Sequence, residues 1–331
     1  MNTLYPLRFT PLYKHYIWGG RRLGILMGRQ LEPGRPYAES WEICDHKDGQ
    51  SVVETGPLTG TTLHKLVVER GAELLGRHAL RDQARPSNNR FPLLLKYLDA
   101  TDRLSVQVHP DDDMAATLKP PDLGKSEAWV VVAAEPGSVI YAGLRSGADR
   151  VKLAEAIDRG TCEKCLHQFE PRVGDCVFLP ARTVHALGAG LLVAEIQQAS
   201  NTTFRLFDWN RLGSDGKPRP LHVEQGLQAI NFSQGQVQPQ RPRPIGRPGR
   251  SRLVECDKFV LDRWEIVSPE MIGEDRRCHI VTVLEGSTAI EGDRADGPLP
   301  RGRTILLPAS AGPYRFTPQG KAVLLDACPP E

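Results

Sequence analysis

Short apolar runs, each bounded by Gly, Pro or Asp, recur along this sequence and limit its fold more than any other feature. Such runs are long enough for one strand but too short for most helices. They lie at residues 51–55, 92–98, 104–109, 128–134, 138–144, 176–180, 191–200, 259–267, 278–286, 304–309 and 322–327. Many short strands with frequent turns are typical of β-sandwiches and barrels. We therefore expect a mainly β protein built from two jelly-roll barrels.

Two stretches interrupt this pattern with helical periodicity. The first includes TTLHKLVVERGAELLG and is placed at about residues 61–85. The second covers about residues 147–169 and predicts two short helices divided at Gly160, because glycine disfavours a helix interior. Both are expected as small helical insertions that cover a β core.

A polar segment dense in Pro and Gly, residues 233–250, predicts a linker between two β units. The first unit then comprises residues 1–232 and contains both helical insertions. The second unit comprises residues 251–331. This division predicts an N-terminal catalytic domain and a smaller C-terminal domain.

The two units share the pattern G-x-x-x-x-L-P-A, at residues 174–181 and again at residues 302–309. Five residues after the proline of each motif, the first unit has His185 and the second has Pro313. This difference predicts that the chemistry belongs to the first unit and that the second is a metal-free structural partner.

Composition excludes several classes of function. The formal net charge is +2, so no strong field favours nucleic acid or a membrane surface. No segment approaches the roughly 20 apolar residues of a membrane span, and the first residues lack a signal-peptide core. The seven scattered cysteines are typical of reduced thiols. We expect a cytoplasmic protein.

The segment LSVQVHPDDD, residues 104–113, is expected to begin with a strand in which polar side chains occupy inward-facing positions. Successive side chains of a strand alternate faces, so Ser105, Gln107 and His109 share one face and the two valines between them share the other. An unpaired buried amide or imidazole costs roughly 1–3 kcal/mol. Something in the folded protein must therefore bind the side chains of Gln107 and His109.

A metal ion is the best candidate. Glu127 and His185 also stand at the edges of strand-like runs, and strands of one barrel direct side chains into a common interior. With Gln107 and His109 they offer two imidazoles, one carboxylate and one amide, a set that suits a catalytic divalent cation, most often Zn²⁺, although other first-row divalent metals could bind. The order and spacing, Q-x-H, then Glu, then G-D-x4-P-x4-H, match the two-part metal motif of cupin barrels.

Over roughly residues 5–211 the chain resembles the type I mannose-6-phosphate isomerases, in particular their short bacterial form. The resembling stretches are YKHYIWGG, AESWEICDH, FPLLLKYLDATDRLSVQVHPDD, GKSEAWVVV, GDCVFLPARTVHAL and AEIQQASNTTFRLFDWNR. The resemblance implies two cupin barrels, one zinc ion per chain, and interconversion of mannose 6-phosphate and fructose 6-phosphate through a cis-enediol. It also implies that the four residues named above are the zinc ligands.

The resemblance further places Arg205, Lys125, Glu195, Lys96 and Ser105 in the pocket. Moving a proton between C1 and C2 of an open-chain sugar needs a base of tuned pKa, and Glu195 and Lys125 are the candidates. Arg205, which keeps its charge, can stabilise the developing enediolate. Lys96 and Ser105 are candidate substrate-binding residues, with the phosphate as one target.

Two other functions remain open on the residues alone. A cupin oxygenase would use a similar site, but it needs a redox metal, and the neutral Gln107 in place of a third His speaks against it. A non-catalytic protein that binds sugar phosphates would keep the fold without turnover. In each case the partner is a small molecule, and the chain is either a monomer or a homodimer.

Three further features invite a functional interpretation, and for each we favour a structural one. CEKC, residues 162–165, has the spacing of a zinc or redox pair but is expected to be a helical turn with two buried thiols. YIWGG, residues 16–20, is expected to pack under the barrel mouth. Glu39 and Glu42 in AESWEI are expected to support the structure.

Overall fold

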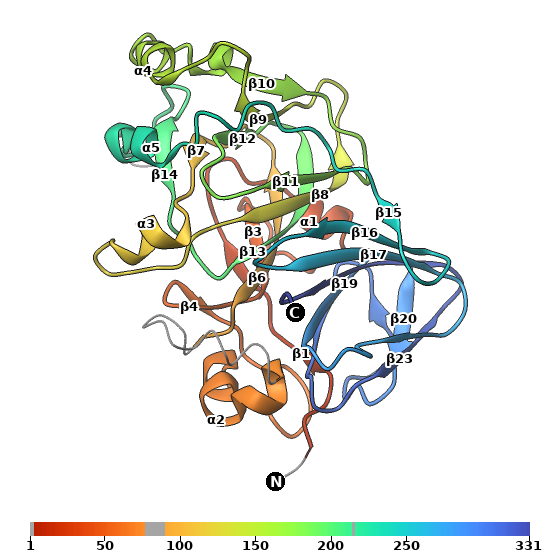
Figure 1. The fold of residues 1–331 in the computed structure, drawn as a ribbon. Helices are drawn as coiled ribbons and strands as arrows, with labels where there is room; N and C mark the ends of the chain where they lie inside the picture. The colour runs from red at the N-terminus through yellow and green to blue at the C-terminus, as the bar shows by residue number, and fades with distance from the viewer. Residues whose placement is uncertain (1–2, 77–89, 214–215) are drawn as a thin grey trace.

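The computed structural model describes residues 3–76, 90–213 and 216–331. They form antiparallel sheets with a few short helices (Figure 1), so the predicted mainly β fold is confirmed. Among the described helices, none combines the length and the apolar character that a membrane span requires.

The N-terminal part of the chain forms a sandwich of two sheets. The larger sheet contains, in spatial order, β11 (Cys176–Leu179), β8 (Glu127–Ala134), β13 (Leu191–Gln198), β6 (Leu93–Ala100), β3 (Glu39–Ile43) and β2 (Leu12–Lys14). The smaller contains β10 (Leu166–Phe169), β9 (Ile140–Leu144), β12 (His185–Leu187), β7 (Val106–Val108) and β14 (Phe204–Phe207). Apolar side chains of the two sheets, such as Val131, Val193 and Ala142, pack together between them.

The C-terminal part forms a second sandwich. Its larger sheet contains β1 (Leu7–Arg8), β22 (Thr304–Leu307), β19 (His279–Glu285), β24 (Ala322–Cys328), β17 (Val260–Ile266), β16 (Arg250–Glu255) and β15 (Arg243–Pro244). Its smaller sheet contains β18 (Glu270–Ile272), β23 (Tyr314–Pro318), β20 (Ser287–Ile290) and β21 (Leu299–Pro300). The first strand of the chain thus pairs with β22 near its other end, and β15 lies inside the segment expected to be a linker.

The two larger sheets pack back to back. Leu95 and Tyr97 of β6 belong to the same apolar cluster as Leu261, Leu306 and Leu325 of the C-terminal sheet. Strand alternation explains this arrangement, because neighbours along β6 point to opposite faces. One face of the N-terminal large sheet therefore lines the interior of its own sandwich, and the other face forms the junction with the C-terminal unit.

The internal repeat is visible in the topology. The order β11-β8-β13-β6 in the first unit corresponds to β22-β19-β24-β17 in the second. The two G-x-x-x-x-L-P-A motifs provide β11 and β22, with Leu179 opposite Glu127 in the first unit and Leu307 opposite His279 in the second. His279 therefore occupies the strand position that corresponds to Glu127.

The first predicted helical insertion is confirmed over α2 (Leu63–Leu75), which begins at Thr62, whose hydroxyl accepts a hydrogen bond from the Lys65 amide. Its apolar side chains, including Leu66 and Leu74, join the junction core. The rest of that stretch, from residue 77 to 85, lies outside the described residues.

In the second insertion only one of the two predicted helices is an α-helix, α4 (Arg150–Asp158), capped by the Asp149 carboxylate. After Gly160, residues Cys162–Cys165 form a single 3-10 turn and Leu166–Phe169 form the edge strand β10. The prediction of a second helix is wrong, because pairing with β9 fixes this segment in an extended conformation. The remaining α-helices of the described residues are α1 (Arg22–Ile25), α3 (Asp112–Ala116) and α5 (Val223–Ala229), and a small hairpin joins β4 (Asp45–His46) to β5 (Gly49–Gln50).

Candidate metal centre and pocket

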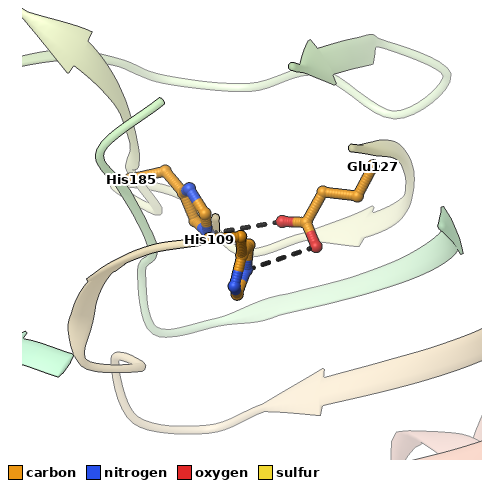
Figure 2. A group of neighbouring side chains, drawn as sticks. All are labelled: His109, Glu127 and His185. Carbon is orange, nitrogen blue, oxygen red and sulfur yellow. Dashed lines mark ion pairs between the residues drawn. The ribbon is translucent and has the colours of Figure 1, made fainter. Parts of the chain in front are cut away.

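Three predicted ligands meet inside the N-terminal sandwich. His109 follows β7, and Glu127 and His185 are the first residues of β8 and β12. The Nε2 atom of His109 lies 3.5 Å from Glu127 Oε2, and that of His185 lies 3.3 Å from Glu127 Oε1 (Figure 2). All three side chains are buried, and their ligand atoms lie within 4.8 Å of one another. The two sheets thus bring together residues that are far apart in sequence.

Both imidazoles are oriented by backbone carbonyls. His109 Nδ1 lies 2.9 Å from the Thr202 carbonyl oxygen, and His185 Nδ1 lies 2.9 Å from that of Thr183. A carbonyl only accepts hydrogen bonds, so each Nδ1 carries the proton and each Nε2 presents its lone pair. Burial lowers the pKa of both rings, that of His185 to about 4. Neutral imidazoles held in this way are ready to bind a metal.

Gln107 completes the group from β7, where it lies opposite His185 in the sheet register. Its Nε2 is 3.3 Å from His185 Nε2, and its Oε1 accepts a 3.3 Å hydrogen bond from the Ser105 hydroxyl. Because the amide oxygen and nitrogen occupy equivalent positions, Gln107 can offer its oxygen to a cation by rotation of the amide. Val106 and Val108, which alternate with Ser105, Gln107 and His109 along the chain, belong to the apolar core on the other face of the sheet. This confirms the predicted alternation.

Glu127 has one cationic neighbour but no hydrogen-bond donor of good geometry. Both carboxylate oxygens are buried and accept no hydrogen bond, although the Lys125 ammonium lies 2.9 Å from Oε2 as an ion pair. Burial, reinforced by the nearby Glu195, raises the pKa of Glu127. A buried carboxylate in this state is destabilising unless a cation or donor satisfies it. Two imidazoles, a carboxylate and an amide fit a divalent cation such as zinc.

A cavity of about 290 Å³ adjoins this group, and Gln107 and Lys125 line it. Two lysines and two carboxylates form a charged cluster along its wall. Lys96 Nζ lies 3.5 Å from Glu195 Oε1 and 3.4 Å from Glu39 Oε2, and Lys125 Nζ also lies 3.5 Å from Glu195 Oε1. Although burial alone would raise it, the pKa of Glu195 is lowered by these ammonium groups. Glu195 is therefore an ionised carboxylate between two cations.

Arg205 lines the same cavity from β14. Its Nη1 donates to the Pro220 carbonyl oxygen at 2.9 Å, its Nε is buried without a partner, and it has no ion pair among the residues that the structure describes. Burial and then the neighbouring Arg219 lower its pKa, yet a guanidinium keeps its charge. Arg219 pairs with Asp208 and also lines the cavity. This wall therefore attracts an anionic ligand.

All nine residues predicted for the site are brought together here, four in or beside the ligand group and five along the cavity. The sequence interpretation misses other lining residues, namely Tyr16, Trp18, Glu39, Asn201, Thr203 and Arg219. The structural interpretation of YIWGG is wrong for Tyr16, which is 42% exposed and stacks on Trp18 with ring centres 5.6 Å apart. Glu39 and Glu42 do not form a pair, because Glu42 points to the opposite face of β3 and binds Arg29.

Two other groups of possible ligands lie outside this site. Cys162 is buried and Cys165 half-buried, and neither belongs to a cluster of three or more ligands among the described residues. In the C-terminal unit, the ligand atoms of Asp275, His279 and Cys328 lie within 4.8 Å of one another. There, however, both His279 nitrogens lie in hydrogen-bond contact with carboxylates.

Family models match both parts of the chain. Residues 7–126 match the type I phosphomannose isomerase catalytic domain, and residues 250–325 match the mannose-6-phosphate isomerase cupin domain. The cupin match agrees with the predicted fold class.

Individual proteins are similar over nearly the whole chain. The chain is 32% identical to mannose-6-phosphate isomerase ManA of Bacillus subtilis over 95% of this chain and 96% of that protein. It is also 32% identical to the mannose-6-phosphate isomerase of Streptococcus mutans, over 91% of each chain. The crystal structure of the mannose 6-phosphate isomerase from Bacillus subtilis superposes with a TM-score of 0.86 at 31% identity, covering 98% of this chain and 99% of that one.

Proposed function

Because the chain belongs to the type I phosphomannose isomerase family, we propose that it interconverts mannose 6-phosphate and fructose 6-phosphate in the cavity between the two N-terminal sheets. The observation that carries this proposal is the meeting of His109, Glu127 and His185 beside a pocket with charged walls. The rival oxygenase and non-catalytic hypotheses have no comparable support.

We propose zinc as the metal, one ion per chain, held by Gln107, His109, Glu127 and His185. The Lewis acidity that a zinc ion would supply when bound to these residues would make a C–H bond next to a coordinated substrate oxygen more acidic. The protein's part is to present two neutral imidazoles and a carboxylate that accepts no hydrogen bond, all in a buried place. The C-terminal unit is proposed as a metal-free structural partner.

Glu195 is the proposed proton-transfer base. Its Oε1 is buried and accepts no hydrogen bond, while Oε2 is fixed by a 3.1 Å hydrogen bond from Trp129 Nε1. An ionised carboxylate with one oxygen fixed and the other directed among Lys96 and Lys125 can take a proton from C1 or C2 and return it to the other carbon. Lys125, next to both Glu195 and Glu127, stabilises negative charge and can relay the proton.

Arg205 is proposed to stabilise the enediolate, since it is a half-buried cation without an acidic partner in the described chain. Preorganised donors of this kind act on charge that develops in the transition state. Ser105 and Lys96 are proposed to bind sugar oxygens, because Ser105 contacts Gln107 and Lys96 lies between two carboxylates. Arg219, at the same wall, is proposed to help Arg205 hold the phosphate.

A metal analysis combined with a coupled isomerase assay tests the proposal. Purified protein is assayed on mannose 6-phosphate and on several other hexose and pentose phosphates, with proton exchange at C1 and C2 followed by NMR. We expect turnover of mannose 6-phosphate that disappears in His109→Ala and persists in His167→Ala, a histidine that binds Gln238 outside the pocket. Full isomerase activity in a metal-stripped sample, or no exchange at C1 and C2, would contradict it.

The seven cysteines all carry free thiols. This supports our proposal that the protein is cytoplasmic, where thiols stay reduced. Its proposed partner is a sugar phosphate, with neither nucleic acid nor membrane, in a monomer or homodimer that size-exclusion chromatography with light scattering would distinguish.

A further inference from the structure

A second cavity lies at the junction between the two units, on the opposite side of β3 from the proposed catalytic pocket. Its volume is about 350 Å³, and it is lined by Tyr13, Met27, Gly28, Arg29, Gln30, Pro300, Arg301 and Arg303. The loop after α1 supplies one wall, and the turn between β21 and β22 supplies the other. Three guanidinium groups thus face one small space that the proposed isomerisation does not use.

Arg29 brings unsatisfied donors to this cavity. Its side chain is buried, and Nη2 donates to Glu42 Oε2 at 2.6 Å and to the Gly302 carbonyl oxygen. Its Nε and Nη1 are also buried but have no hydrogen-bond partner. Buried N–H groups in a guanidinium are costly when they are left unpaired. Two N–H groups of this cavity-lining arginine are therefore buried and left without a partner.

The balance of charge in the cavity is positive. Glu42 pairs with Arg29, and Glu54 pairs with Arg303. Arg301 has no ion pair among the described residues, and its Nε is buried without a hydrogen-bond partner. Three guanidiniums and two carboxylates leave one net positive charge, close to the three unpaired N–H groups.

We propose that this junction cavity binds a small phosphate-bearing anion, with Arg29, Arg301 and Arg303 as its ligands. Guanidinium groups bind multi-oxygen anions through paired hydrogen bonds, and several of them around one space suit a tetrahedral phosphate better than a single carboxylate. The volume lies within the range of small-molecule sites. The Tyr13 hydroxyl, on the same wall, is a further possible donor.

The two cavities share one sheet. Glu39 of β3 lines the proposed catalytic pocket and accepts a hydrogen bond from Trp41 Nε1, and Glu42 of the same strand contacts the junction cavity through Arg29. An anion at Arg29 and Arg301 would replace unpaired N–H groups with charge-assisted hydrogen bonds on the back of that strand. The site is thus placed to stabilise the contact between the units without entering the catalytic pocket.

Inorganic phosphate is the probe for this site, measured by ³¹P NMR titration and by the thermal midpoint of the holoprotein. The experiment is run in an Arg205→Ala background, so that phosphate at the proposed catalytic pocket does not obscure the result. In this background, the test variant is Arg301→Gln. The matched control is Arg315→Gln, which removes one exposed positive charge of the same unit outside the cavity.

We expect Arg301→Gln to weaken phosphate binding about tenfold or more, the usual effect of losing a charge-assisted hydrogen bond, and Arg315→Gln to leave it unchanged. If Arg301→Gln fails to fold, Arg303→Gln should weaken binding in the same direction. Equal phosphate affinity in all variants, or no binding in the Arg205→Ala background, would overturn the proposal. Isomerase activity of the Arg301→Gln single variant separates this outcome from failure of the proposed function.

Discussion

His279, at the start of β19, holds a positive charge inside the C-terminal sandwich. Its Nδ1 lies 2.7 Å from Asp326 Oδ1, and its Nε2 lies 2.9 Å from Asp275 Oδ1. Each ionised carboxylate can only accept, so both ring nitrogens must carry protons. Burial alone would lower the pKa of His279, but Asp326 and Asp275 raise it to about 9. The folded protein thus contains a buried imidazolium.

The size and sign of its effect on stability follow from this pKa. An unperturbed histidine has a pKa of 6.5, so folding raises the value by about 2.5 units, and at 1.36 kcal/mol per unit the upper limit is about 3 kcal/mol. Because the folded pKa is raised, the full contribution is present below pH 6.5 and is lost as the pH rises to about 9. The free energy of unfolding should fall over that window.

Trp264 provides the measurement. It is the single tryptophan of residues 251–331, and its Nε1 lies 3.3 Å from Asp326 Oδ2. Urea unfolding followed by tryptophan fluorescence, to which Trp264 contributes, at a series of pH values from 6.5 to 9, gives the free energy of unfolding of the wild type and of His279→Gln. The difference between the two should shrink by about 3 kcal/mol across the series.

His15→Gln is the matched control, since His15 is exposed, lies against the Pro36 carbonyl oxygen and the Tyr37 ring, and has no ion pair among the described residues. Its pH dependence should match that of the wild type. If the free energies of unfolding of wild type and His279→Gln instead ran parallel from pH 6.5 to 9, the buried imidazolium would be refuted. A parallel course would mean that folding does not raise the pKa of His279.

Four further outcomes are expected. Removal of metal by a chelator should abolish isomerase activity, and zinc should restore it in a coupled assay. His109→Ala and His185→Ala should each lose both metal, by elemental analysis, and activity. Arg205→Ala should keep the metal and lose about 10²–10³-fold in kcat, the usual effect of removing one preorganised donor; an unchanged kcat would remove its transition-state role. Cys162→Ser should keep normal metal content and activity, and a lower zinc stoichiometry would revive a second site.

The sequence is most informative where strand alternation limits the choices. The pattern of residues 105–109 by itself places Gln107 and His109 on one face, because Val106 and Val108, which alternate with them, have to face apolar surroundings. The shared G-x-x-x-x-L-P-A pattern separately predicts the internal repeat, and β11 and β22 keep the same register in both units. The two-part motif then predicts Glu127 and His185 as their partners, and the two facing sheets of the N-terminal sandwich bring these residues together.

The residues whose role sequence patterns do not predict either lie in loops or lie on opposite faces of one strand. Arg219 and Asn201 lie in segments without periodicity, so nothing in their neighbours shows where they point. Glu39 and Glu42 cannot act as a pair, because three residues along a strand separate its two faces. The second helix of the 147–169 insertion fails for another reason, because tertiary pairing with β9 outweighs local helical propensity.

Pairing between β1 and β22 joins segments from nearly opposite ends of the chain, and this has a consequence for biosynthesis. While a ribosome is still making the C-terminal sheet, the apolar back of β6, β8 and β13 has no cover, and β1 has no partner strand. Such contacts between distant segments form slowly, and exposed strand edges of a nascent chain invite aggregation. We therefore expect chaperone dependence to be greatest just before translation of β22 and β24.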